Sequence, residues 1–265
     1  LVTRADFEDR RRYVNITRTL EALHRVRAVP ILNENDTVAV DEIRFGDNDV
    51  IAALTANLVR ADLMVLLTVV DGLYRGDELI DFVPRVQQDV LGVAQARKST
   101  LGRGGMQSKL QSVLMATEAG VDVVIANGRR TDVLPKLILK GDRLGTVFAG
   151  QARKIASRRS WLAWAVRPAG RITVDAGAVR ALSAGGKSLL PSGITGVTGR
   201  FSRGAVVEVA GPDGKCFARG QVKYAADEIS RIAGRKTTEI PQILGAAVAD
   251  EVIHRNDLTL ISPDE

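Results

Sequence analysis

The sequence has 265 residues, of which 45% are hydrophobic, so it can fill one large core or two ordinary ones, and a disordered protein is excluded. Its formal net charge is +6, but 31 acidic residues lie among 37 lysines and arginines, which favours a site for an anionic ligand, or a weak nucleic-acid surface, over a dedicated nucleic-acid coat. No apolar run approaches the roughly 18 residues of a membrane helix, and the start has no signal-peptide layout. One cysteine, Cys216, suits a reducing compartment. We therefore expect a cytoplasmic protein that makes no use of a membrane.

The first half of the chain alternates between helix and strand patterns. Residues 5–25 carry apolar side chains at helical spacing, and the apolar run 26–33 predicts a short strand. A helix at 48–60, a buried strand at 63–70, a helix at 106–119 and a strand from Val121 are expected to follow. Helices interleaved with continuous Val, Ile and Leu strands indicate a parallel sheet that is covered on both faces. Residues 1 to about 150 are therefore predicted to form an α/β unit.

The pattern changes after Gly150. A basic connecting stretch is followed, from Arg171 onward, by short β-type runs that glycine turns separate. The segment 212–214 reads Pro-Asp-Gly between two alternating runs, which predicts a hairpin. The second half should form a small, mostly β domain.

Two acidic clusters lie close together, "NEND" at 33–36 and "GDND" at 46–49. The alternating run between them is expected to fold outward as a hairpin whose base brings Asp36 beside Asp47, at the carboxyl end of a strand where open parallel sheets usually bind ligands. A simpler interpretation is that Asp36 ends a strand and that Asn48 or Asp49 caps a helix. Carboxylates and an amide in one pocket could bind a substrate amine, position a cation, or orient lysines that contact phosphate.

A second candidate site is the glycine-rich stretch that begins at Gly102 and leads into the helix at 106–119. Glycines before a helix resemble a loop that cradles phosphate with its backbone N–H groups, although the P-loop pattern is absent and a plain flexible turn is an equal alternative. Lys109 lies in the first turn, where a cation gains nothing from the helix dipole, so it should have an anionic partner. Thr68, at the end of the strand at 63–70, is expected to face the same crevice.

These motifs together resemble the glutamate 5-kinase family, the amino-acid-kinase-fold enzymes of proline biosynthesis whose bacterial members carry a C-terminal PUA domain. The resemblance covers essentially the whole chain and follows the family's order of blocks. The blocks read "LVTRADFEDRRRYVN", "VPILNENDTVA", "GDND", "LLT..DGLY", "GRGGMQSK", "GRITVDAGAV", "LLPSGITGVTGRFSRG" and "ISRIAG".

The resemblance implies a three-layer, parallel-sheet amino-acid-kinase fold at 1–155 and a PUA-like domain with its connector at 156–265. It also implies ATP-dependent phosphorylation of the side-chain carboxylate of L-glutamate with Mg²⁺, in a homo-oligomer that proline inhibits; no metal ligand of the protein's own is predicted. By the same resemblance Asp36 and Asn48 bind glutamate, and Asp49 and Lys109 are the catalytic pair, in which Asp49 orients lysines around the transferring phosphoryl group. The residues implied for ATP are Thr68, Arg103, Gly104, Gly105, Met106, Gln107, Ser108 and Lys109.

The chain departs from the family pattern in several places. The family has aspartate where this chain has Val69, so the carboxylate expected near the nucleotide is lost unless Asp71 substitutes for it. The family has threonine where this chain has Arg103, and the stretch 90–102 is several residues shorter. Family members open with a strand and glycine turn that carry a phosphate-binding lysine, and nothing here corresponds to that opening. We therefore expect a truncated sequence that starts without methionine at Leu1, with little or no kinase activity on its own.

Three alternatives remain open at this point. Kinases of the same fold that act on acetylglutamate, aspartate or uridine monophosphate are disfavoured by the PUA-like tail. A non-catalytic remnant is suggested by Val69 and the missing opening. An RNA-binding role, which we do not favour, would use a basic face of the second domain formed by Arg200, Arg203, Lys215, Arg219 and Lys223.

Overall fold

The computed structural model describes residues 1–35, 37, 47–87, 90, 92, 105–151, 161–246 and 248–261. It divides into two compact units, at Leu1–Ser157 and Arg158–Glu265. In the part of the chain so described, no helix has the length and apolar character that crossing a bilayer requires.

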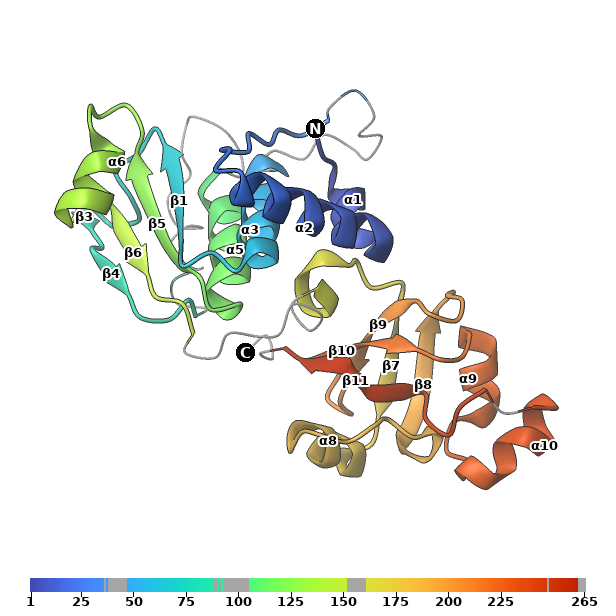
Figure 1. The fold of residues 1–265 in the computed structure, drawn as a ribbon. Coiled ribbons are helices and arrows are strands. Elements are labelled where there is room, and N and C mark those ends of the chain that lie inside the picture. The colour runs from blue at the N-terminus through green and yellow to red at the C-terminus, as the bar shows by residue number, and fades with distance from the viewer. Residues whose placement is uncertain are drawn as a thin grey trace. The chain divides into compact units, whose positions relative to one another are not determined.

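The helices of the first unit follow the predicted order (Figure 1). The one helix expected at 5–25 is in fact two, because Asp9 caps the second helix by accepting hydrogen bonds from the backbone N–H groups of Arg11 and Arg12, both at 2.9 Å. The helical elements are α1 (Arg4–Glu8), α2 (Arg10–Arg25), α3 (Asp47–Val59), α5 (Gly105–Glu118), α6 (Val133–Pro135) and the π-helical segment η1 (Lys136–Lys140).

The strand predicted at 26–33 is wrong. That segment contains no strand, and the side chains of Val29 and Ile31 are 88% and 94% exposed. A strand needs a neighbour to complete its hydrogen bonds, and Pro30 supplies no N–H group. The first residue after this segment to pair with another part of the chain is Glu34, which forms an isolated parallel bridge with Val2.

The sheet of the first unit has the strand order β1-β5-β6-β4. β1 runs parallel to β5 and β4 runs parallel to β6, but β5 and β6 are antiparallel, so the sheet is mixed rather than wholly parallel. A separate two-stranded sheet pairs β2 with β3. The bounds are β1 (Leu63–Thr68), β2 (Tyr74–Arg75), β3 (Glu78–Leu79), β4 (Phe82–Val83), β5 (Asp122–Asn127) and β6 (Thr146–Phe148).

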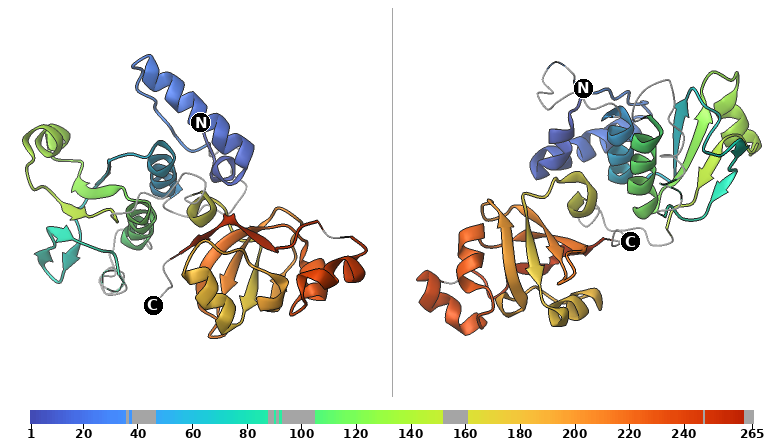
Figure 2. Two further views of the ribbon diagram at one scale, coloured as in Figure 1. Left: turned by 60° about the horizontal axis from the view of Figure 1, so that its bottom comes forward. Right: turned by 180° about the vertical axis from the view of Figure 1, so that it is seen from behind.

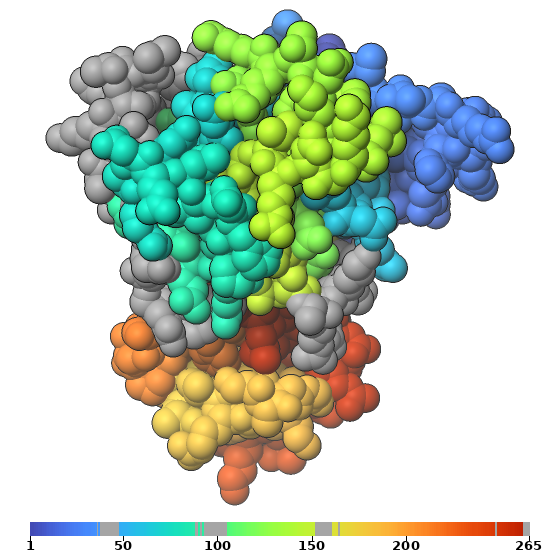
Figure 3. All heavy atoms as spheres, turned by 90° about the vertical axis from the view of Figure 1, so that its left-hand side faces the viewer, coloured from blue at the N-terminus to red at the C-terminus, as the bar shows by residue number. Residues whose placement is uncertain are grey.

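Helices cover both faces of this sheet, as predicted. α3 and α5 pack on each other and on β1 and β5 (Figure 1, Figure 2). On the other face, α6 buries Val133 against Val124 and Ala126 of β5. The space-filling view shows α6 and η1 in yellow-green beside the turquoise β2–β4 segment on this outer side of the unit (Figure 3). The first unit therefore has three layers.

The second unit is built on a five-stranded sheet with the order β11-β10-β9-β7-β8. Its core is a continuous cluster of buried side chains that includes Ile172, Val209, Tyr224 and Ile229. The predicted hairpin at 212–214 is confirmed, since it joins two antiparallel strands, β9 and β10. The elements are η2 (Trp161–Ala165), β7 (Gly170–Val174), α8 (Ala176–Ser183), η3 (Pro191–Gly193), β8 (Ile194–Gly199), β9 (Val206–Ala210), β10 (Cys216–Val222), α9 (Ala226–Ile232), η4 (Thr237–Glu239), α10 (Ile240–Leu244) and β11 (Ile253–Leu260).

Candidate functional site

The first turns of α3 and α5 lie at the edge of the sheet where β1 and β5 end. α3 leads directly into β1 and α5 leads directly into β5, so each helix runs opposite to the strand that follows it. Because β1 and β5 are parallel, both helix N-termini meet at the carboxyl edge of these strands. An anion bound at this edge would face the positive ends of two helix dipoles.

An ion pair joins the two helices at this edge. The Nζ atom of Lys109 lies 2.8 Å from Oδ2 and 3.1 Å from Oδ1 of Asp49, across 60 positions of sequence. The two side chains are only 19% and 20% exposed. The anionic partner expected for Lys109 is therefore present, and Asp49 fixes the position of a cation beside the open end of α5.

Thr68 and Asn127 end β1 and β5 side by side. They are register partners in the parallel pair, and the backbone N–H of Gly128 donates to the Thr68 carbonyl at 2.8 Å. Thr68 is half-buried, whereas the following Val69 is 53% exposed. Thr68 and Asn127 are thus ordered strand ends at the same edge of the sheet as the Asp49–Lys109 pair.

The other predicted site residues lie around the same edge or outside the described residues. Asn48 lies in the first turn of α3 with an exposed side chain. Gly105, Met106, Gln107 and Ser108 form the first turn of α5, whose leading N–H groups have no partner within the helix. Asp36, Arg103 and Gly104 fall outside the described residues, as does the predicted approach of Asp36 to Asp47.

A second polar network, centred on Asp71, lies at the same edge. Oδ1 of Asp71 accepts hydrogen bonds from Asn127 Nδ2 at 3.1 Å and from Arg130 Nε at 2.9 Å, while the Tyr74 hydroxyl donates to Oδ2 at 3.4 Å. These hydrogen bonds, that of Asn127 first, hold the pKa of Asp71 below its usual range. Neither Asn127 nor Arg130 is among the site residues predicted from the sequence. The only signal available was a polar "ANGRR" run directly after a buried strand.

A hydrogen bond from β6 stabilises the turn that carries Asp71. The backbone N–H of Leu73 donates to Oγ1 of Thr146, the first residue of β6, at 2.8 Å. A Cβ atom at Gly72 would lie 2.5 Å from the same oxygen, so the close approach requires glycine. The turn after β1 is therefore held by two sets of hydrogen bonds, those of the Asp71 side chain and that of the Thr146 hydroxyl.

The described residues contain no group of three or more His, Cys, Asp or Glu side chains that could hold a metal ion. The polar groups that meet at the edge are an ammonium ion, helix N-termini and single carboxylates. This donor set suits a phosphate-bearing ligand better than a metal ion bound by protein groups alone.

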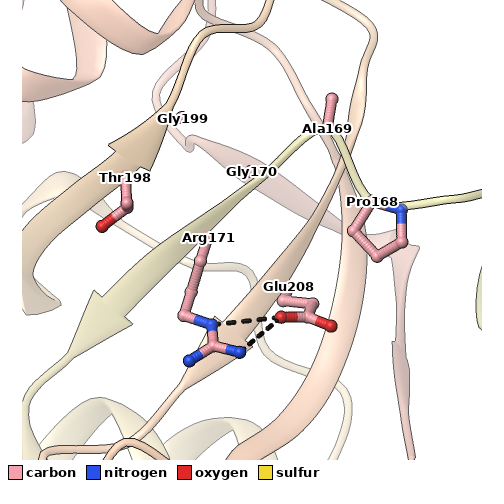
Figure 4. A pocket seen from close by; sticks show the side chains of 7 residues that line it. All are labelled: Pro168, Ala169, Gly170, Arg171, Thr198, Gly199 and Glu208. Carbon is pink, nitrogen blue, oxygen red and sulfur yellow. Dashed lines mark hydrogen bonds and ion pairs between the residues drawn. The ribbon is translucent and has the colours of Figure 1, made fainter.

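The second unit has an open pocket of about 390 Å³ near the start of β7 (Figure 4). Arg171 and Glu208 line it, and Arg171 donates to Glu208 from Nε at 3.1 Å and from Nη2 at 2.8 Å. The hydrogen bonds to Glu208 raise the pKa of Arg171. None of the residues that line this pocket begins a helix, so the pocket lacks the helix N-termini that face the carboxyl edge of the first unit.

Three of the five basic residues considered for RNA binding already have partners within the second unit. Arg203 forms a two-point ion pair with Glu228. Lys223 lies 3.3 Å from Asp257, and Arg219 donates to the carbonyl of Ala163. These contacts weaken the basic face as a nucleic-acid surface.

Curated relatives match the chain from end to end. A protein from Moorella thermoacetica named "Glutamate 5-kinase" is 46% identical over 98% of this chain and 71% of its own length, and a namesake from Anaeromyxobacter dehalogenans is 48% identical over 98% and 70%. The chain belongs to the glutamate 5-kinase family. An amino acid kinase family model matches residues 1–127 and a PUA domain model matches residues 170–244, which confirms the predicted fold class.

Some solved structures resemble parts of this glutamate 5-kinase homologue. They include N-acetylglutamate synthase from Neisseria gonorrhoeae, at 28% identity over 40% of this chain and 24% of that chain with a TM-score of 0.34. A PUA domain from Aeropyrum pernix K1 matches at 27% identity over 33% of this chain and 43% of that chain, with a TM-score of 0.24.

Proposed function

We propose that the chain transfers the γ-phosphoryl group of ATP to the side-chain carboxylate of L-glutamate and so forms glutamyl 5-phosphate, the first step of proline biosynthesis. The observation that carries the proposal is the ion pair of Asp49 and Lys109 at the joint N-terminal end of two helices. The family membership supplies the reaction and the two substrates.

In this reaction a carboxylate oxygen of glutamate forms a bond to the γ-phosphorus, and the bond from that phosphorus to the bridging oxygen of ADP breaks. No proton has to move, so the protein contributes position and charge neutralisation. Lys109 places a positive charge at the N-terminal end of α5, where its ammonium group contacts the phosphates of ATP. Asp49 does not touch the substrates in this scheme; it holds the ammonium group in position.

The remaining roles follow the family resemblance. Asp36 and Asn48 bind glutamate, and the carboxyl edge and the start of α5 bind ATP. Mg²⁺ bound together with the nucleotide would neutralise phosphate charge during the transfer, and no side chain of the chain is assigned to it. The residues proposed for ATP binding are Thr68, Arg103, Gly104, Gly105, Met106, Gln107, Ser108 and Lys109.

The proposal is tested on the 265-residue chain by titration with MgATP in a calorimeter and by trapping the acyl phosphate with hydroxylamine. We expect Lys109→Ala to weaken ATP binding by at least tenfold, because a charge-assisted contact to phosphate is lost. Lys140→Ala removes an exposed lysine on the opposite face of the sheet and is the matched control. ATP binding that is absent in the unaltered chain, or equal in the Lys109→Ala variant, would refute the proposal.

The hydroxylamine assay also measures turnover. The low activity predicted from the sequence stays a prediction, and ATP binding without any ATP- and glutamate-dependent hydroxamate would favour the non-catalytic alternative. Oligomerisation and inhibition by proline are proposed from the family alone; sedimentation tests the first, and the hydroxylamine assay with and without proline tests the second. An RNA affinity that falls steeply with salt would revive the RNA-binding alternative.

A further inference from the structure

Asp71 is a fully engaged carboxylate at the edge where we propose that ATP binds. Its Oδ1 atom accepts hydrogen bonds from Asn127 Nδ2 and Arg130 Nε, and Arg130 Nη2 lies 2.8 Å from the same oxygen. Its Oδ2 atom receives the hydroxyl of Tyr74. Both oxygens of Asp71 therefore accept hydrogen bonds, and these contacts hold Asn127 and Arg130 in place.

The chief group that Asp71 holds is the guanidinium of Arg130. Asp71 takes its Nε and Nη2 edge, whereas Nη1 has no hydrogen-bond partner among the described residues. Asp71 thus holds one edge of the guanidinium, while the Arg130 side chain is 53% exposed and so accessible to a ligand. A guanidinium fixed in this way loses little further freedom when it binds.

The surroundings of Arg130 favour a nucleotide base over a phosphate. Val69 and Val70, which link Thr68 to Asp71, are 53% and 38% exposed, so apolar surface lines the edge here. The Asp71 turn also lies on the β2 and β6 side, since it contacts Tyr74, whereas Lys109 is held by α3. Phosphates at Lys109 would leave the base farther along the edge, toward apolar side chains and a planar cation.

Resting on the proposed function, we propose that Arg130 stacks on the base of the bound nucleotide and that Asp71 is the positioning residue that holds it there. A guanidinium face attracts an aromatic ring whatever its hydrogen-bonding edge, so this contact contributes affinity rather than a choice between bases. It also provides an ordered contact at an edge where the family's aspartate is replaced by Val69.

The first test compares Arg130→Ala, Arg130→Lys and Arg129→Ala by calorimetric titration of the 265-residue chain with MgATP. We expect Arg130→Ala to raise the dissociation constant roughly tenfold, and Arg130→Lys to raise it nearly as much, because lysine lacks the planar group. Arg129 is the neighbouring exposed arginine, and its removal controls for charge. Restoration of affinity by Arg130→Lys would show a phosphate contact and overturn the stacking role.

The second test asks whether Asp71 acts through Arg130. Asp71→Ala should lose as much ATP affinity as Arg130→Ala, and the double variant should lose no more than either one. Additive losses, or an Asp71→Ala variant that binds like the unaltered chain, would overturn the positioning role. Asp71→Leu keeps the approximate size of the side chain without an acceptor oxygen, and it replaces Asp71→Ala in this comparison if circular dichroism shows that the alanine variant is unfolded.

The outcomes separate this inference from the proposed function. If Lys109→Ala loses ATP affinity but Arg130→Ala does not, the inference fails and the proposed function stands. If the unaltered chain binds no ATP, both fail.

Discussion

The partnership of Asp49 and Lys109 predicts a measurable coupling in stability. The variants are Asp49→Asn, Lys109→Met and their combination. Two unit charges 4 Å apart attract by about 4 kcal/mol at the effective dielectric constant of a protein surface, and desolvation of the two groups opposes much of this gain. With both side chains about four-fifths buried, we expect a coupling of about 1–2 kcal/mol, between the values typical of exposed and buried pairs.

The assay is urea unfolding of all four proteins, followed by far-UV circular dichroism and by tryptophan fluorescence. Both tryptophans, Trp161 and Trp164, belong to the second unit, so their fluorescence transition is an internal control that should not move. Each single variant should lower the unfolding midpoint of the first unit, and the double variant should lose less than the sum of the two. Additive losses would show that Asp49 does not hold Lys109, and the catalytic arrangement proposed above would lose its basis.

Three further predictions concern stability elsewhere in the chain. Tyr224→Phe should destabilise the second unit by about 2–3 kcal/mol in the fluorescence-detected unfolding, because the buried hydroxyl accepts two backbone N–H groups; an unchanged midpoint would contradict this. Gly145→Ala should lower the free energy of unfolding, measured by circular dichroism, by at least about 2 kcal/mol, because the φ of Gly145 is +89° and a Cβ atom would lie 2.1 Å from a β5 carbonyl oxygen. Gly141→Ala is the control, since a Cβ atom there meets open space and the loss should be smaller. The guanidinium of Arg203 lowers the pKa of Glu228 in the folded protein, so the ionised carboxylate stabilises the fold above its unfolded pKa, and this stabilisation is lost as the pH falls through the folded pKa. The Glu228→Gln variant should therefore be less stable than the unaltered chain at pH 7 and equally stable at the acid end. A stability difference that is constant at every pH would refute the link.

Long periodic segments carried enough information in the sequence to predict most elements. α3, β1, α5 and β5 form where the apolar pattern placed them, because burial decides the conformation of such runs. The run 26–33 is equally apolar, but it contains no strand, since apolar character does not supply a hydrogen-bonding neighbour. The apolar pattern thus predicted the long buried elements well, and it failed at a short run whose apolar side chains remain exposed.

The candidate site shows the same division. The residues alone predicted that Lys109 needs an anionic partner, and the family resemblance implied that this partner is Asp49. Asn127 and Arg130 could not be predicted, since a single amide and a single arginine after a strand form no pattern. Their role depends on Asp71, 56 and 59 positions away, which only the folded chain brings within hydrogen-bonding distance.

The direction of β6 has a consequence for how the candidate site is built. A strand parallel to β1 and β5 would bring its last residue to their carboxyl edge, whereas β6 runs the other way and brings its first residue, Thr146. The hydroxyl that supports the turn after β1 therefore comes from a residue 73 positions beyond Leu73, and β1, β5 and β6 must be assembled before that turn is set. β6 and the turn after β1 should accordingly gain and lose their order together, so that amide exchange in this turn reports the folding of β6.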